Sequence, residues 1–379
     1  MRRKLPWFVA WLLTALALSE QAGTAAWGAS PATFEEQTLF SSGEGGYTRY
    51  RIPSLAVSTR GTVLAVCEAR GGEGSDWSDI DLVLRRSLDG GRTWTAMRRI
   101  ADAGPLTAGN PCPVVDRDTG TIWLPFCRGS KPGRGNAEIL LMKSVDDGKT
   151  WSEPVNISDS AKDPAWPFAG TGPGHGIQLR TGRLLVPCWA DSTPRCGEIQ
   201  TSYCFYSDDH GGSWRLGRPL TRDASDECDV VELADGTVYL NARSRRGKRQ
   251  RAYAFSSDGG HTWSEVKYDP SQPEPSCDGG LVRLTDTARF DKSRVLVVSP
   301  ADPNARRTMT VRLSYDECRT WPVSQVVCEG PSAYVDLAVC RDQQVLCLYE
   351  ADNYAKIVLA RFNIEWLTDG KDSLRPKKP

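Results

Sequence analysis

The sequence contains five copies of an eight-residue pattern, Ser-x-Asp-x-Gly-x-Thr-Trp, with small departures. Intervals of about 49 to 63 residues between neighbouring copies indicate an array of similar supersecondary units rather than one irregular domain. Asp and Gly favour a tight turn, and the closing Trp buries a large apolar surface beneath it. The repeats therefore predict a hairpin turn that recurs in successive β-sheet modules. The copies begin at Ser87, Ser144, Ser207, Ser256 and Ser314.

Short apolar or alternating runs lie between the repeats, and no stretch longer than about ten residues keeps a helical period. The short sequences TRGT, DTGT, RTGR and ADGT each separate two such runs and predict tight hairpins. The chain after its first thirty residues, divided by an interval of about 57, gives about six modules. The sequence therefore predicts an all-β fold, a six-bladed β-propeller with five Asp-box hairpins, whose C-terminal strands pair with the N-terminal segment.

The two ends of the chain differ in composition from its middle. Three basic residues precede an apolar run from Trp7 to Leu18, and small residues follow. This order predicts a secretory signal peptide over residues 1–30, because the run is too short to span about 30 Å of hydrocarbon comfortably. We expect a secreted or periplasmic protein with no membrane span, whose residues 31–368 form the propeller. Residues 369–379 have little apolar content and predict a disordered charged tail.

Charge and histidine content limit the classes of partner. Lys+Arg and Asp+Glu both number 47, so the formal net charge is zero and does not favour nucleic acid or a membrane surface. The three histidines share no short metal-ligand spacing, so we expect no metal and no cofactor. No long apolar face is left over, which favours a monomer.

Twelve cysteines follow the predicted signal peptide. Cys67 and Cys127 lie in apolar β-like runs, where a free thiol packs as a small hydrophobic group. We therefore expect most of the cysteines to be free, although an exported chain permits disulfides. The best local candidate for a disulfide joins Cys196 to Cys188 or Cys204.

The repeated Asp residues are expected to be structural. Repeats around a ring place equivalent residues at distant positions, whereas catalysis needs a few groups that converge on one point. In the fifth copy Cys318 replaces Gly, so we expect a tighter or less regular turn there. The chemistry should come from residues that are not repeated and that project into the centre of the ring. The repeated residues are Asp89, Asp146, Asp209, Asp258 and Asp316.

Several segments together resemble the exo-α-sialidases of the bacterial type, over essentially everything from about residue 35 to 365. A RIP tripeptide alone is weakly specific, whereas RIP with five repeats, a central Glu and a late GPSAY in this order is strongly specific. The resemblance implies a six-bladed propeller that cleaves terminal sialic acid from glycans, glycoproteins or glycolipids. The segments are RIP (51–53), EAR (68–70), SDWSDIDLV (75–83), DECDVVELADG (226–236), LNARS (240–244), ARRTMTVRLSYD (305–316) and GPSAY (330–334).

The resemblance also implies roles for particular side chains. For the third arginine of the family's triad, Arg306 competes with Arg307, and we prefer Arg306 because it lies six residues before Arg312. The matched residues are Arg51, Arg243 and Arg306 for the triad, Arg70 for a further pocket arginine, Asp76 for the acid/base, Glu227 for the base and Tyr334 for the nucleophile.

These residue types suit sialic acid, whose anomeric carbon carries a carboxylate. A planar guanidinium meets a carboxylate with two parallel donors, and an arginine cluster without compensating acids would itself imply an anionic ligand. Two negative charges at about 4 Å repel by about 4 kcal/mol at an effective dielectric near 20, which favours a neutral phenol over Asp or Glu as the nucleophile. Because the phenol has a pKa of about 10, a carboxylate must take its proton. Sialidases with a Tyr nucleophile are a known exception among glycosidases, so that role comes here from the resemblance alone.

Other interpretations stay open at this point. Taken singly, Tyr334 is typical of a buried aromatic, and Glu227 and Asp76 of turn or loop residues. The arginines are singly typical of surface charges. His175, in a Gly-rich segment, fits a ligand contact or a plain turn equally. The alternatives to a retaining exo-α-sialidase are a propeller that binds sialylated glycans without turnover, a repeat-containing propeller used for protein recognition, and a trans-sialidase.

Overall fold

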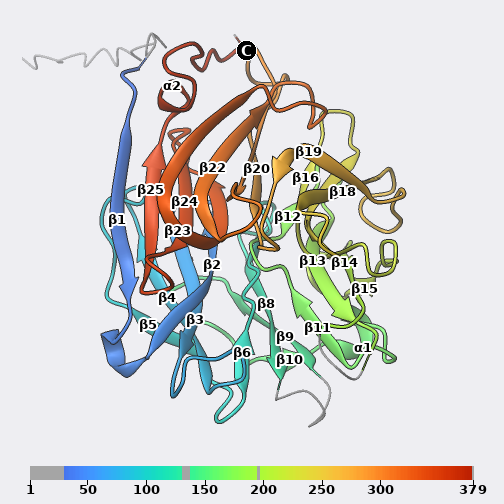
Figure 1. Cartoon of the computed structure of the whole chain (residues 1–379). Coiled ribbons are helices and arrows are strands. Elements are labelled where there is room, and N and C mark those ends of the chain that lie inside the picture. The colour runs from blue at the N-terminus through green and yellow to red at the C-terminus, as the bar shows by residue number, and fades with distance from the viewer. Residues whose placement is uncertain (1–29, 130–136, 194–196, 378–379) are drawn as a thin grey trace, which may run out of the picture.

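The computed structural model describes residues 30–129, 137–193 and 197–377, so the predicted signal peptide before Ser30 lies outside it. Within this part the regular structure is almost entirely β, which confirms the all-β prediction (Figure 1). The strands pair antiparallel there, except for one parallel contact between β4 (Ile80–Ser87) and β6 (Thr107–Gly109). The helical elements described are η1 (Glu44–Gly46), α1 (Ser158–Ala161) and α2 (Ile364–Leu367).

The first sheet consists of two antiparallel sets that β4 and β6 join. Each set follows chain order from the inner strand outward, because short hairpins connect its neighbours. The first set is β2 (Arg49–Val57), β3 (Val63–Arg70), β4 and β5 (Arg98–Ala101), and the second is β6, β7 (Val114–Val115), β8 (Ile122–Gly129), β9 (Glu138–Ser144) and β10 (Val155–Asn156).

Two further sheets follow the same chain order. The third set of strands is β11 (Phe168–Thr171), β12 (Ile177–Gln178), β13 (Leu184–Asp191), β14 (Gln200–Ser207) and β15 (Arg215–Leu216). The fourth is β16 (Ser225–Glu232), β17 (Val238–Ser244), β18 (Gln250–Ser256) and β19 (Lys267–Pro273).

The C-terminal sheet contains strands from both ends of the chain. Its order begins with β1 (Phe34–Ser41), which pairs with β25 (Lys356–Phe362) in the register Phe34 to Phe362. Figure 1 shows this blue N-terminal strand beside the red C-terminal strands. The predicted pairing of the C-terminal strands with the N-terminal segment is therefore confirmed. The other members are β24 (Val345–Ala351), β23 (Val323–Val339), β22 (Arg307–Ser314), β21 (Arg294–Pro300) and β20 (Gly280–Thr285).

The hydrophobic core lies between neighbouring sets of strands. One cluster joins Leu55 and Val63 of the first set to Leu346 and Leu359 of the C-terminal sheet, all fully buried. Burial of one such side chain contributes about 1.5–3 kcal/mol, so face-to-face packing of the sheets holds the array together.

Buried carboxylates connect the innermost strands across these packed faces. Asp336 of β23 accepts a hydrogen bond from the backbone N–H of Leu55 at 2.7 Å, and Asp229 of β16 accepts one from Leu281 N at 3.0 Å. Both aspartates are about 1% exposed or less. These contacts fix the inner strands relative to one another, and the candidate site is built on those strands.

The five repeats form the predicted hairpin turns, each between two paired strands. In each copy the Ser hydroxyl donates to the Asp and accepts from the backbone N–H four residues later. The other Asp oxygen accepts the Thr or Ser hydroxyl near the end of the copy. The repeated Asp residues therefore hold their own turns.

The fifth turn differs from its prediction. Cys318 adopts a φ of 65°, in the left-handed region that glycine favours, and its N–H still donates to Ser314 Oγ at 2.9 Å. The expected tighter or less regular turn is therefore wrong, because the hydrogen bonds of the repeat tolerate the added side chain.

The C-terminal segment also differs from its prediction. Asp372 pairs with the fully buried Arg294 at 2.8 Å, and Pro376 forms a bridge with Phe290. A disordered tail is therefore wrong for residues 369–377, because one buried ion pair and several backbone hydrogen bonds hold a segment that has little apolar content. Residues 378 and 379 lie outside the described residues.

The cysteines are mostly buried. Cys188 and Cys204 are fully buried free thiols, and Cys196, the other half of the suggested disulfide, lies outside the described residues. A search of the described chain for a helix long and apolar enough to cross a membrane finds none.

Candidate active site

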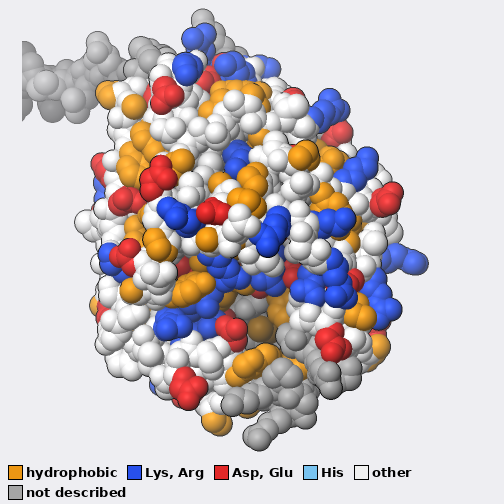
Figure 2. All heavy atoms as spheres, in the orientation of Figure 1, with side chains coloured by type: hydrophobic (Ala, Val, Ile, Leu, Met, Phe, Trp, Pro, Cys, Tyr) orange, Lys and Arg blue, Asp and Glu red, His pale blue; other side chains and the backbone are white. Residues whose placement is uncertain are grey.

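The seven residues singled out by the sequence line one cavity of about 320 Å³. Strands β2, β16 and β23 contribute Arg51, Glu227 and Tyr334 to its lining. Figure 2 shows Lys and Arg side chains gathered round a hollow in the face viewed. The residues brought together are Arg51, Arg70, Asp76, Glu227, Arg243, Arg306 and Tyr334.

Register shifts position three of these residues. The β2–β3 ladder is irregular between Arg51 and Ser54, β16–β17 between Ser225 and Cys228, and β23–β24 between Ser332 and Val335. A bulge bends its strand and re-aims a side chain, and bulges are frequent beside active sites. The three shifts thus turn Arg51, Glu227 and Tyr334 into the same cavity.

Tyr334 and Glu227 form the floor of the cavity. The Tyr334 hydroxyl donates to Glu227 Oε1 at 2.7 Å and accepts from Arg243 Nη1 at 3.0 Å. The second carboxylate oxygen, Oε2, lies 2.9 Å from the same Nη1 as an ion pair, outside hydrogen-bond geometry. A phenol, a carboxylate that can take its proton and a cation thus lie in mutual contact.

Burial sets the titration of this pair. Burial raises the pKa of Tyr334 well above its ordinary value, although the Arg243 guanidinium opposes the shift. Burial also raises the pKa of Glu227, again against the effect of Arg243. The resting pair is therefore a neutral phenol beside a carboxylate that takes up a proton more readily than an exposed Glu does.

A carboxylate lies behind each of three cavity arginines, and sequence reasoning assigned no role to these acids. Glu350 Oε1 accepts from Arg51 Nε at 2.5 Å, and Asp226 accepts two hydrogen bonds from Arg243 at 2.7 and 2.9 Å. Glu68 Oε2 accepts from Arg70 Nε and Nη2. The negative charges of these acids therefore balance part of the positive charge of the arginine cluster. Each acid fixes one edge of a guanidinium and leaves its other edge toward the cavity.

Glu350 also holds the nucleophile candidate. Its Oε2 accepts from Tyr334 N at 3.2 Å while its Oε1 binds Arg51. The signal for Glu350 in the sequence was only a Glu at the end of an apolar run. Its two partners are known only once the strands have packed.

Arg306, and not Arg307, lines the cavity. The Arg306 guanidinium donates to Ser276 O at 2.8 Å and to Tyr354 Oη at 3.4 Å, and it lies 5.2 Å from the Tyr334 ring centre. Among the described residues it has no carboxylate partner, so its charge is the most available to a bound anion. Arg307 is exposed at the start of β22.

Asp76 extends from the segment between β3 and β4, and its side chain is 72% exposed. Arg70 Nη1 donates to Asp76 Oδ1 at 2.6 Å, and Arg51 Nη1 lies 4.0 Å away. The cavity walls disfavour charge on Asp76, but the guanidinium of Arg70 outweighs them and holds its pKa below the ordinary value. In this structure the Asp76 carboxylate therefore occupies part of the arginine cluster.

Aromatic side chains line another part of the cavity. Trp77 and Phe168 meet edge to face at 6.1 Å between ring centres, and Trp189 lines the same cavity. These residues carried no signal in the sequence beyond their apolar character. They give the cavity an apolar side opposite its charged side, which suits a ligand with both kinds of surface.

His175 lies outside this cavity. Its Nδ1 pairs with Asp336 Oδ1 at 2.8 Å, and ligand atoms of His175, Asp229 and Asp336 lie within 4.8 Å of one another. Both Asp336 oxygens already accept backbone N–H groups, from Leu337 and Leu55. The group therefore works as a hydrogen-bonded connection between inner strands.

Comparison with known proteins places the chain in a family. A family profile described as "BNR repeat-like domain" matches residues 61–347. The chain is 35% identical over 359 residues to a sialidase of Micromonospora viridifaciens, covering 88% of this chain and 54% of that protein. It is 31% identical over 368 residues to Sialidase-2 of Cricetulus griseus, covering 87% of this chain and 96% of that protein.

Solved structures of sialidases and trans-sialidases also superpose on this chain. The structure of Hadza microbial sialidase Hz136 superposes with a TM-score of 0.80 at 29% identity, covering 88% of this chain and 69% of that chain. The intramolecular trans-sialidase from Ruminococcus gnavus shares the fold, with a TM-score of 0.75 at 19% identity over 87% of this chain and 98% of that chain.

The β-sheet array with its repeats, together with the profile match, defines a BNR-repeat protein. The chain belongs to the sialidase family. It spans about half to three fifths of the length of the first two curated relatives, 54% of the Micromonospora viridifaciens sialidase and 61% of a Bacteroides fragilis sialidase.

Proposed function

We propose that this protein is a retaining exo-α-sialidase that hydrolyses terminal α-linked sialic acid from sialylated glycans, glycoproteins or glycolipids. The observation that carries the proposal is the 2.7 Å hydrogen bond from Tyr334 to Glu227 within a cluster of four arginines. We further propose that the sheets form six blades of one propeller and that residues 1–30 direct export. The protein would then act as a secreted or periplasmic monomer.

The arginines account for binding. Arg51, Arg243 and Arg306 all approach Tyr334, with guanidinium carbons 5.3 and 5.2 Å from the ring centre for Arg51 and Arg306 and a direct hydrogen bond for Arg243. A sugar whose carboxylate meets these three groups has its anomeric carbon above the phenol. Each charge-assisted hydrogen bond contributes about 1.5–3 kcal/mol, which is enough to fix the sugar in one orientation.

Attack by the phenol follows from this placement. Tyr334 Oη forms a bond to the anomeric carbon as its proton passes to Glu227 Oε1, and the bond to the leaving oxygen breaks. Asp76 protonates that oxygen, so that a neutral alcohol departs. A water then attacks the same carbon, giving its proton to Asp76, while Glu227 returns the proton to the departing phenolate. Two displacements at one carbon give net retention.

Asp76 must be protonated for this role, although its ion pair with Arg70 favours the ionised form. A substrate carboxylate among the arginines neutralises part of their charge and adds a negative charge near Asp76. Both effects raise the pKa of Asp76, because an opposite charge favours ionisation and a like charge disfavours it. Substrate binding thus prepares the acid.

The direct test is turnover. The purified protein is incubated with sialyllactose and with a fluorogenic sialoside from pH 4 to 8, and free sialic acid is measured. We expect release by the wild type and, by NMR, the α-anomer of sialic acid as the first product. Calorimetric binding of sialic acid without release at any pH would overturn the enzymatic proposal and favour a glycan-binding protein. Transfer to an added acceptor in preference to water would instead indicate a trans-sialidase.

A further inference from the structure

A second cavity lies at the other end of the innermost strands. Its volume is about 590 Å³, and within the described chain it shares no lining residue with the candidate active site. β2 contributes Arg51 to the active-site cavity and Leu55 to the second one, and β23 likewise contributes Tyr334 and Leu337. The two cavities therefore open at opposite ends of the same strands.

The inner walls of the second cavity are apolar. Leu55, Val115, Ile177, Val282 and Leu337 come from five different strands and face the same space. A cavity of this size holds a small organic molecule, and its walls favour an apolar body. Water and inorganic ions gain little from such walls.

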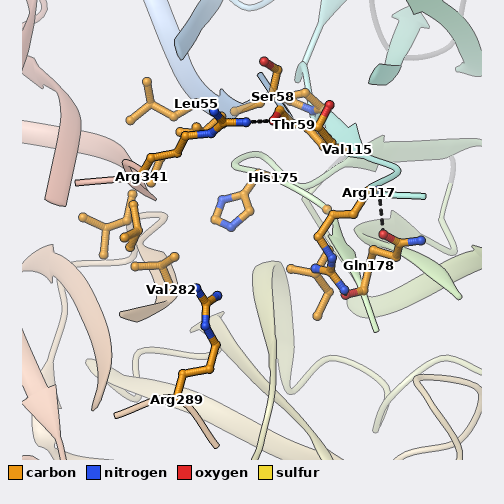
Figure 3. A pocket seen from close by; sticks show the side chains of 18 residues that line it. Leu55, Ser58, Thr59, Val115, Arg117, His175, Gln178, Val282, Arg289 and Arg341 are labelled. Atoms are coloured by element: carbon orange, nitrogen blue, oxygen red, sulfur yellow. Dashed lines mark hydrogen bonds between the residues drawn. The ribbon is translucent and has the colours of Figure 1, made fainter. Parts of the chain in front are cut away.

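The mouth of this cavity is basic. Figure 3 shows Arg117, Arg289 and Arg341 around the opening with His175 between them. Arg117 donates to the backbone carbonyls of Gln178 and Leu179, and Arg341 donates to Thr59 O. None of the three arginines forms an ion pair with any part of the chain that the structure describes.

The lining of the cavity offers no charge to balance these groups. It contains no Asp or Glu among the described residues. His175 has Asp336 as a counter-ion at 2.8 Å, and Asp229 lies within 4.8 Å of both, so this group adds no positive charge to the three arginines. Three positive charges thus surround an apolar cavity, and an anion seated there would lower their mutual repulsion.

We propose that this cavity binds an amphipathic organic anion, whose apolar body packs against the inner strands and whose acidic group lies between Arg117, Arg289 and Arg341. The site is separate from the sialidase site and needs none of its residues. Apolar walls select against small inorganic anions, and the arginines select against neutral apolar molecules. A carboxylate or sulfonate on a ring or chain has both required features.

The test uses anilinonaphthalene sulfonate, an amphipathic anion whose fluorescence rises in an apolar site. We expect saturable binding to the full-length protein and about a tenfold or greater weakening in Arg289→Ala, the loss expected for one charge-assisted hydrogen bond. Arg289 suits the test because its side chain has no hydrogen-bond partner in the described residues, so its removal spares the fold. Arg289→Glu should weaken binding further.

Two matched variants locate the site. Arg60 is exposed on the β2–β3 hairpin beside the cavity but does not line it, so Arg60→Ala removes the same charge from the same face. Arg306→Ala removes a charge from the active-site cavity and so reports any probe bound there. Arg60→Ala should bind the probe as the wild type does, and Arg306→Ala should keep the binding component that Arg289→Ala weakens. Equal affinity in wild type and Arg289→Ala, or equal weakening in Arg60→Ala, would overturn the proposal.

Competition tests the ligand class. Octanoate should displace the probe from the wild type, and octan-1-ol at the same concentration should not. If octan-1-ol displaces the probe at least as effectively as octanoate does, the requirement for an anion is overturned. Absence of saturable probe binding to the wild type would overturn the site itself.

Discussion

Tyr334 Oη donates to Glu227 Oε1 at 2.7 Å, so the phenol that we propose as nucleophile already touches the group that would take its proton. Tyr334→Phe removes only this hydroxyl, while the ring keeps its contacts with Arg51 and Arg306. We expect kcat on a fluorogenic sialoside to fall at least about a thousandfold, with unchanged thermal unfolding. Retention of more than a tenth of the activity would contradict the nucleophile assignment.

We expect Glu227 to set the acid limb of the pH–activity profile. Burial raises its pKa above the ordinary value of 4.5, and the group must be ionised to accept the phenolic proton. Activity should therefore fall as the solution is acidified, and the midpoint of this fall should lie at a pH higher than 4.5. Measurement of kcat/KM across pH 4 to 8 should show this limb in the wild type. In Glu227→Gln the limb should vanish and kcat should fall by about 10² to 10⁴.

Arg306 and Arg307 offer a matched pair of substitutions at adjacent positions, where β22 begins. Arg306 lines the cavity and has no carboxylate partner in the described chain, whereas Arg307 is exposed outside it. Arg306→Ala should raise KM for a sialoside about 10- to 150-fold, the equivalent of about 1.5–3 kcal/mol. Arg307→Ala should leave KM within about twofold. Equal effects of the two substitutions would argue against a substrate contact by Arg306.

The contribution of Asp76 to kcat should be largest for leaving groups that require protonation. A phenolic leaving group departs without much help from a proton, whereas a galactose hydroxyl does not. Asp76→Asn should therefore lose about 10² or more in kcat on sialyllactose and much less on an aryl sialoside. An equal loss on both substrates would indicate that Asp76 only positions Arg70, to which it is bound at 2.6 Å.

Asp372 should stabilise the C-terminal segment through Arg294, which is fully buried. Asp372→Asn leaves that charge with Asp291 alone at 3.1 Å, and we expect a loss of about 3 kcal/mol in the free energy of unfolding by urea at pH 7. The exposed pair of Asp369 with Lys371 at 3.7 Å is the control, and Asp369→Asn should cost less than about 0.5 kcal/mol.

The same ion pair has a definite pH dependence. Burial opposes ionisation of Asp372, but Arg294 outweighs it and lowers the pKa from 3.8 to about 2. The stabilisation is therefore complete above pH 3.8 and is lost as the pH falls from there toward 2. The wild type should lose its advantage over Asp372→Asn across this window. An advantage that persists unchanged at pH 2 would contradict the ionic origin.

Local patterns predicted much of this fold. The five repeats and the sequences TRGT, DTGT, RTGR and ADGT all lie at hairpins, because Asp, Gly and Thr determine a turn through bonds to their nearest neighbours. Of the two candidates for the third arginine, the preferred Arg306 lines the cavity, whereas Arg307, the first residue of β22, does not.

Glu68 lies only two positions from Arg70, but other acids paired with arginines could not be predicted from local spacing. Arg51 and Glu350 are 299 positions apart, and Arg294 and Asp372 are 78 positions apart, so no local spacing links them. The register shifts that aim Arg51, Glu227 and Tyr334 likewise depend on which strand pairs with which. For the same reason the low apolar content of residues 369–377 predicts disorder, whereas the distant Arg294 holds this segment through Asp372.

The pairing of β1 with β25 has a practical consequence. Phe34 lies opposite Phe362, so strands from opposite parts of the sequence form one ladder, with β1 outermost in its sheet. Truncation that removes β1 would therefore uncover the backbone edge of β25, which is a template for pairing with another copy and for aggregation.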